Sequence, residues 1–302
     1  MVRNSSVDKN PLKGDNEHMP KKETSGRTRF DFKQIFVPAL VVVAIALAFF
    51  SGTLWQKVQG FEKGTSTTGK TTDTTAQAGT TEPTVSLDTI KGLFGKDVIK
   101  FGNADSKLIF VEMSDPSCPY CHIAGGYDPE IASGAGSRFT YASAGGTYVP
   151  PVTEIEKLVK AGKASFVYIY YPGHGNGEMA MKALYCANEK GKFWEVNKLL
   201  MSEAGYGIEN GTDAAGKAVS VTVGNDKTKS AVMADFLKSA IDQTFMESCL
   251  NSGKYDARLT SDQDLATSLG IQGTPDFYIN ATNFGGAYSY TDMRSVVDAA
   301  LK

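Results

Sequence analysis

The hydrophobic pattern divides the chain into an apolar run, a polar spacer and a longer alternating region. From Ile35 to Phe50 every residue is apolar, and Ser51 to Trp55 extends this run with small and aromatic residues. Roughly 20 helical residues, at about 1.5 Å each, span about 30 Å, which is the thickness of a bilayer core. The pattern therefore predicts a single transmembrane anchor over residues 34–55.

The segments on either side of this run are too polar to bury a core. Residues 1–33 mix charges and carry several lysines and arginines, whereas residues 56–84 are rich in Thr, Gly, Ser and Lys. We expect a disordered cytoplasmic tail, then the anchor, then a flexible tether. The basic residues before the anchor predict a single-pass protein of the cell membrane with its N-terminus in the cytoplasm and the rest outside.

Two other readings of the apolar run remain open. A cleaved signal peptide is disfavoured by the long polar lead and by the lack of an Ala-x-Ala site after the run. A buried core helix would rarely be so uniformly apolar.

Residues 85–302 form the predicted folded domain. Its pattern predicts strands that alternate with helices, which indicates an α/β fold. A helical block at about 176–269 interrupts the alternation, and we expect it to be an inserted helical domain. The expected strands are 97–102, 108–113, 165–171, 276–279 and 287–290, and the expected helices start at 118, 153, 178 and 291, with a Gly-rich break at 205–216.

Composition narrows the possible functions. The chain has 302 residues, of which 41% are hydrophobic and 21% are charged, and its formal net charge is −2. This balance suggests no nucleic-acid partner. Only three histidines occur, so a histidine-built metal site is unlikely, and we expect no metal and no cofactor. The four cysteines permit one redox pair and one structural pair.

The segment Cys118-Pro119-Tyr120-Cys121 carries the strongest chemical signal. It follows an apolar strand and is expected to open a helix. The first sulfur of such a pair lies beside unpaired backbone N–H groups and the positive end of the helix dipole, and both favour the thiolate. We expect Cys118 to be the exposed, reacting sulfur and Cys121 the more buried, resolving thiol. A CxxC pair can also be half of a zinc site, but Cys186 and Cys249 are isolated and offer no second close pair.

A second signal is Gly273-Thr274-Pro275, which precedes a predicted strand. A proline entering a central strand removes a donor from the hydrogen-bond ladder, so it is best tolerated at the first position. Such a bond can be cis. By itself the segment is usually only a turn.

Taken together, these motifs resemble the thioredoxin superfamily and, more narrowly, the DsbA-like disulfide oxidoreductases. The resemblance extends over residues 95–302. Further segments that carry it are Ala187–Glu195, Cys249–Tyr255 and Leu269–Asn280.

This resemblance implies roles for three more residues. Pro275 is expected to be cis and to pack against the cysteine pair, where the backbone of Thr274 would bind an extended substrate peptide. Glu112 matches a buried acidic residue that adjusts the resolving thiol and relays its proton; an exposed carboxylate at a strand edge is the alternative. The dipeptide here is Pro-Tyr, whereas the best-known oxidases carry Pro-His, so oxidising strength stays open.

The remaining cysteines and histidines are expected to have structural roles. A disulfide between Cys186 and Cys249 is plausible outside the cytoplasm, and two buried thiols are the alternative. His122 is expected to be an exposed helix residue rather than one that perturbs the site. Phe193 and Trp194 are expected to be core residues of the insertion.

The resulting hypothesis is a thiol–disulfide oxidoreductase that introduces disulfides into exported proteins. Its expected partners are those proteins, a membrane redox partner that reoxidises it, and the lipid bilayer. One alternative is an isomerase or reductase that uses the same centre. Another is a surface binding protein in which the CPYC pair is only a structural disulfide.

Overall fold

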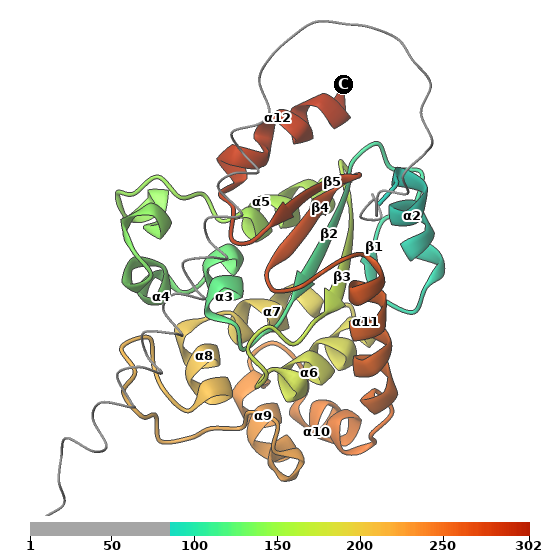
Figure 1. Cartoon of the computed structure of the whole chain (residues 1–302). Coiled ribbons are helices and arrows are strands. Elements are labelled where there is room, and N and C mark those ends of the chain that lie inside the picture. Colours follow the sequence, from blue (N-terminus) through green and yellow to red (C-terminus); the bar gives the residue numbers. More distant parts are fainter. Residues whose placement is uncertain (1–84) are drawn as a thin grey trace, which may run out of the picture. The chain divides into compact units, whose positions relative to one another are not determined.

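The computed structural model describes residues 85–302 (Figure 1). The predicted cytoplasmic tail (1–33), transmembrane anchor (34–55) and tether (56–84) lie outside these residues. Within 85–302, none of the helices combines the length and the apolar character needed to cross a bilayer.

A mixed sheet forms the centre of the domain, with the strand order β1-β3-β2-β4-β5 (Figure 1). Strand β2 pairs in parallel with β3 and antiparallel with β4, and the outer pairs β1–β3 and β4–β5 are antiparallel. All six residues of β2 are buried, as expected for a strand covered on both faces. The strands are β1 (Ile99–Phe101), β2 (Ile109–Ser114), β3 (Ser165–Tyr170), β4 (Asp276–Ile279) and β5 (Thr282–Gly285).

Helices cover both faces of this sheet, because alternate residues of the strands point to opposite sides. On one face, Val111, Val167 and their neighbours pack against helices α2 (Leu87–Gly92) and α11 (Asp256–Ser268). On the other face, Phe110, Phe166 and further residues join a larger core that includes α5 (Pro151–Lys160), α6 (Glu178–Glu189) and α12 (Tyr290–Leu301). The thioredoxin-like α/β architecture is thereby confirmed at the level of the fold.

The predicted helical insertion lies between β3 and β4. It begins with α6 and continues through α7 (Phe193–Leu200), α8 (Glu203–Asn210), α9 (Ser230–Leu237) and α10 (Gln243–Asn251) to α11 (Figure 1). Phe193 and Trp194 anchor it, because their rings lie 5.4 and 5.3 Å from the ring of Phe101 on β1. Their predicted role as core residues is confirmed.

Two predicted boundaries were wrong. The Gly-rich break begins after Asn210, because Gly205 lies inside α8, where Ser202 caps the helix by accepting from the Gly205 amide. A Cβ on Gly205 would lie 2.0 Å from the Leu200 carbonyl oxygen, so glycine here allows α8 to begin against the end of α7. The last strand is 282–285 rather than 287–290.

The position of this last strand follows from a tight hairpin. Ile279 pairs with Thr282, so only Asn280 and Ala281 connect β4 to β5. Asn280 has a φ of 52°, a conformation that asparagine tolerates better than most residues. The pattern of apolar positions after residue 286 predicts a later strand. Because the turn after β4 has only two residues, β5 begins earlier, at Thr282.

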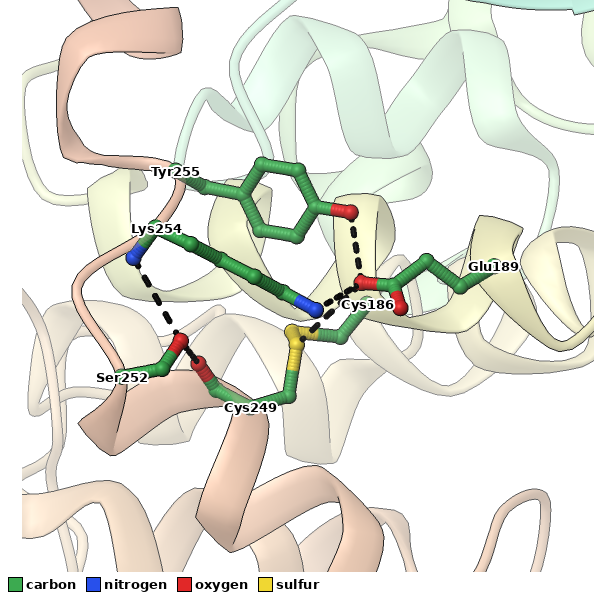
Figure 2. The surroundings of a disulfide bond; sticks show 6 residues. All are labelled: Cys186, Glu189, Cys249, Ser252, Lys254 and Tyr255. Atoms are coloured by element: carbon green, nitrogen blue, oxygen red, sulfur yellow. Dashed lines mark hydrogen bonds and ion pairs between the residues drawn. A yellow bond between two sulfur atoms is a disulfide. The ribbon is translucent and has the colours of Figure 1, made fainter.

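The predicted Cys186–Cys249 disulfide is present and joins α6 to α10 (Figure 2). Glu189 Oε1 lies 3.6 Å from Cys249 Sγ and accepts from Tyr255 Oη at 2.6 Å, and Lys254 Nζ lies 2.5 Å from the same oxygen. These three side chains cover a disulfide of which Cys186 is fully buried and Cys249 is 6% exposed. The bond therefore links the first helix of the insertion, α6, covalently to α10.

Removing this disulfide should destabilise the domain, because the bond closes a loop with a sequence separation of 63 residues. We expect Cys186→Ala/Cys249→Ala to lower the free energy of unfolding by about 2–4 kcal/mol. Urea unfolding measures this best in a Cys118→Ala/Cys121→Ala background, which serves as the matched control because only the Cys186–Cys249 pair then differs. Equal stabilities of the two proteins would contradict the assignment of a stabilising role.

Candidate functional site

The redox pair lies where β2 ends and helix α3 (Pro119–Gly125) begins. Cys118 is the N-cap residue of α3 with extended backbone angles, and its side chain caps no amide. Pro119 follows at the first helical position, where its missing N–H removes no hydrogen bond. Cys121 N–H and His122 N–H both donate to the Cys118 carbonyl oxygen, which fixes the first helical turn behind the reactive residue.

The turn before Cys118 is held by the side chain of Asp115. One carboxylate oxygen accepts from the amide and the hydroxyl of Ser117 at 2.9 and 2.7 Å. The other oxygen accepts from the amides of His174 and Gly175 at 2.7 and 3.0 Å. Asp115 thus connects the active-site turn to the loop that leads into the insertion.

The two thiols are unbridged and differ in environment. Cys121 is fully buried, and the Asp115 amide donates to its sulfur at 3.5 Å. Cys118 is 5% exposed, and its thiol donates to the Thr274 carbonyl oxygen at 3.4 Å. Cys118 is therefore the more accessible of the pair, as predicted. The prediction that it would be exposed was wrong in degree, since the loop before β4 covers most of the sulfur.

Their surroundings separate the pKa values of the two thiols. A hydrogen bond from the Cys121 side chain lowers the pKa of Cys118 to about 6; the Thr274 hydroxyl and the amides of Cys121 and Tyr120 act in the same direction, against the effect of burial. Burial raises the pKa of Cys121 well above its usual value, and the adjacent Cys118 adds to this. The arrangement favours a thiolate on Cys118 and a protonated thiol on Cys121.

The loop that faces the pair carries Thr274 and Pro275, whose peptide bond is cis. The predicted cis geometry is confirmed, and the Cys118–Thr274 hydrogen bond brings this loop and the CPYC segment together across 156 residues of sequence. Within residues 85–302, the Thr274 amide makes no recorded backbone hydrogen bond. A backbone donor is thus left free beside the reactive sulfur.

Glu112 lies in the middle of β2 and is 1% exposed, so the expectation of a buried acid is confirmed and the alternative of an exposed edge residue is wrong. Burial raises the pKa of its carboxyl to about 8, although the Ser114 hydroxyl opposes the shift. The Ser114 hydroxyl also acts on Cys121, where it opposes the rise in pKa. Glu112 and Cys121 therefore share Ser114 as a neighbour.

The prediction that His122 would be exposed was wrong, because its side chain is fully buried. Its Nε2 lies 2.7 Å from the Pro116 carbonyl oxygen, and the Asp128 and Glu209 carboxyl groups flank the ring. The position of His122 directly after the second cysteine could draw attention to it in the sequence. Its acidic partners, however, come from two other segments. Only the fold brings these three residues together.

A cleft of about 650 Å³ lies beside the cis-proline loop. Tyr120 of the CPYC segment, which is 45% exposed, and Thr274 form part of its wall. Aromatic side chains from two other segments complete it, and the guanidinium of Arg138 lies 4.4 Å from the ring centre of Phe139. The other aromatic residues are Tyr148 and Tyr288.

Comparisons with known proteins give one family match and one curated relative. Residues 152–299 match the family described as Thioredoxin. The Na(+)/H(+) antiporter NhaA 3 of Salinispora tropica is 22% identical over 204 residues, which make up 66% of this chain and 24% of the antiporter. The chain thus spans about a quarter of the length of that curated relative.

Several solved structures are also similar. Oxidised BdbD from Bacillus subtilis has a TM-score of 0.47 at 16% identity, over 68% of this chain and 92% of that one. The catalytic domain of ScsC from Proteus mirabilis has a TM-score of 0.46 at 19% identity, over 71% and 96% of the two chains. The α-DsbA1 protein of Wolbachia pipientis has a TM-score of 0.46 at 17% identity, over 68% and 91%.

The family match over residues 152–299 indicates a thioredoxin-like fold. The paired cysteines lie at the start of a helix, as the resemblance to the thiol–disulfide oxidoreductases predicts.

The pKa of Cys118 gives a direct test of the site. Since only the thiolate is alkylated quickly, the iodoacetamide rate of the reduced protein should rise with pH and reach half its plateau near pH 6. Cys121→Ala should raise this midpoint, because it removes the hydrogen bond that lowers the Cys118 pKa most. A midpoint near the ordinary pKa of about 8.5 in the unaltered protein would contradict the site described here.

Proposed function

We propose that this protein introduces disulfide bonds into exported proteins through the Cys118–Cys121 pair. The observation that carries the proposal is a thiol with its pKa lowered to about 6 at the start of α3, in contact with the Thr274–Pro275 loop, with a buried second thiol behind it. The alternative of a purely structural disulfide gives no reason for such a difference between the two thiols.

The reaction starts from the oxidised pair. A thiolate of the substrate attacks Cys118 Sγ, the Cys118–Cys121 bond breaks, and Cys121 leaves with the electron pair and takes up a proton. The second substrate thiolate then attacks the substrate sulfur of the mixed disulfide and releases Cys118 as the thiolate. The substrate loses two electrons, and the cysteine pair gains them.

The electrostatics of the site favour this direction. A low pKa stabilises the thiolate of the reduced pair, so reduction of the pair becomes more favourable and its disulfide becomes a stronger oxidant. The same centre would act as a reductant or an isomerase if its reduction potential were low. The lowered pKa of Cys118 is the specific reason to prefer disulfide donation.

The free amide of Thr274 supports a role in holding the substrate. An extended peptide that crosses the site can accept a hydrogen bond from this amide, in the manner of an added strand. The cleft beside Tyr120 would take side chains that flank the substrate cysteine. Thr274 and Pro275 therefore act on the substrate's position, while the two cysteines carry the exchange.

Glu112 is proposed to exchange a proton with Cys121. A carboxyl with a pKa of about 8 can both give and take a proton near neutral pH. Cys121 needs a proton when it leaves and must lose one when it attacks. The Ser114 hydroxyl acts on the pKa of both groups, which supports their being near each other, although it makes no hydrogen bond within residues 85–302.

The proposed location is outside the cytoplasm. Residues 34–55 would anchor the protein in the membrane and residues 56–84 would tether the domain to it. Exported proteins are then the available substrates, and the electrons taken from them must pass to a membrane redox partner. Disulfides persist in such compartments, which agrees with the Cys186–Cys249 bond.

The role of the two cysteines can be tested with a reduced, unfolded substrate protein. Cys118→Ala should abolish disulfide formation, because no sulfur remains for the substrate to attack. Cys121→Ala, first converted to a mixed disulfide of Cys118 with glutathione, should exchange glutathione for the substrate thiol and trap a Cys118–substrate mixed disulfide, visible on a non-reducing gel. If Cys118→Ala retained the activity of the unaltered protein, the proposed function would be wrong.

Glu112→Gln tests the proton route, because glutamine has nearly the same shape but cannot accept the proton. We expect the resolution of a Cys118 mixed disulfide by Cys121 to slow by about 10²-fold at pH 7, measured by rapid quenching. The alkylation rate of Cys118 serves as the control and should not change. An unaltered rate of resolution would exclude Glu112 from the step.

A further inference from the structure

His122 occupies a position whose chemistry the exchange reaction alone does not explain. It follows Cys121 on α3, its side chain is fully buried, and its Nε2 lies 2.7 Å from the Pro116 carbonyl oxygen. A carbonyl oxygen only accepts, so Nε2 must carry the hydrogen of this bond. Pro116 is buried as well, and its carbonyl would lose this partner if His122 were replaced by an apolar residue.

The other neighbours of the ring are acidic. Asp128, the N-cap residue of α4 (Pro129–Gly134), places Oδ2 3.6 Å from His122 Nδ1. Glu209 on α8 places Oε2 3.8 Å from Nε2. Both acidic side chains are buried, and Asp128 Oδ2 and both Glu209 carboxyl oxygens have no hydrogen-bond partner within residues 85–302.

Other titratable groups also surround the cluster. Tyr206 on α8 meets the His122 ring edge-on at 5.2 Å between ring centres. Tyr141 donates its hydroxyl to the carbonyl oxygens of His122 and Asp128 at 3.3 and 3.2 Å. Asp115 in the active-site turn raises the pKa of Glu209. None of these groups supplies a second positive charge.

The charge of the ring follows from this arrangement. A neutral imidazole would turn the lone pair of Nδ1 toward the Asp128 carboxyl group, whereas an imidazolium presents a hydrogen there. Burial would lower the pKa of His122, but the Asp128 and Glu209 carboxyl groups outweigh it and raise the pKa to about 9. Burial raises the pKa of Glu209 to about 8. At neutral pH the ring is therefore a cation, which the two carboxyl groups favour.

The cluster is connected to Cys118 through the backbone of the active-site turn. His122 holds the Pro116 carbonyl, and Asn210 Nδ2, next to Glu209 on α8, donates to the Ser117 carbonyl at 3.0 Å. Two consecutive carbonyls immediately before Cys118 are thus held, one by α3 and one by α8 of the insertion. The ring lies against the same turn through its contact with the Pro116 carbonyl, and a positive charge there would add to the field of the α3 amides.

We propose that His122 is a positioning residue of the redox centre: as a buried imidazolium held by Asp128 and Glu209, it fixes the turn before Cys118 and favours the Cys118 thiolate. This inference rests on the proposed function, because it assigns a further residue to that site. In this proposal the insertion helps to position the redox centre, because Glu209 and Asn210 belong to its helix α8.

His122→Gln removes the charge but retains a side-chain N–H that can reach the Pro116 carbonyl. We expect the Cys118 pKa, followed by thiolate absorbance of the reduced protein, to rise by about one unit. The equilibrium constant with glutathione should shift about tenfold toward the disulfide, which is about 30 mV. Glu209→Gln is the matched comparison: it leaves the ring in place but removes one of the two groups that raise the His122 pKa, so it should raise the Cys118 pKa by less than His122→Gln does.

A purely structural role would lower the melting temperature of His122→Gln and leave the Cys118 pKa and the glutathione equilibrium unchanged. That result would overturn the inference while the proposed function stands. If the unaltered protein showed no thiolate that titrates near pH 6 and disappears in Cys118→Ala, the proposed function itself would fail.

A second measurement needs no His122 variant. Coupling between two titrating groups is reciprocal, so loss of the Cys118 thiolate should lower the pKa of His122 by the same amount of about one unit. Nitrogen NMR of the imidazole ring measures this pKa in the reduced protein and in Cys118→Ala. A His122 ring that is neutral at pH 7, or a pKa that is the same in both proteins, would contradict the proposal.

Discussion

The structure of this site depends on the placement of one negative charge. A thiolate on Cys118 would be unfavourable in a position that is only 5% exposed, since burial penalises charge. The hydrogen bond from the Cys121 side chain, the Thr274 hydroxyl and the amides of Cys121 and Tyr120 together outweigh that penalty. The Cys121 thiol and the amides belong to the start of α3, and the Thr274 hydroxyl belongs to the loop before β4. The turn held by Asp115 places Cys118 beside them.

This constraint explains why the site contains several buried acids. Burial raises the pKa of Glu112 to about 8, so this carboxyl is mostly neutral at pH 7 and adds little negative charge near the thiolate. Burial also raises the pKa of Glu209, and the neighbouring His122 opposes that rise. Glu112 can exchange protons with Cys121, and Glu209 helps to hold His122. The thioredoxin-like core and the helical insertion therefore contribute different donors and charges to one reaction centre.

Much of this could be predicted from local sequence. The CPYC pair after an apolar strand and the Thr274–Pro275 segment before another strand are local motifs, and the run of β2 is apolar enough to indicate a buried strand. The burial of Glu112 is implied only by the family resemblance, because the local pattern also allows an exposed carboxylate. The burial of His122 could not be predicted, because Asp128 and Glu209 come from separate elements. The covering of Cys118 depends on a loop 156 residues away, and the β4–β5 hairpin depends on the backbone of Asn280.

The redox equilibrium of the Cys118–Cys121 pair with glutathione tests the central claim most directly. If the site favours the Cys118 thiolate as described, the reduced pair is stabilised, and the reduction potential should lie above about −270 mV, shifted in the direction of the oxidising end near about −120 mV. A potential near about −270 mV would mean that the reduced form gains no such stabilisation. That value would contradict the account of the site and the assignment as a disulfide donor.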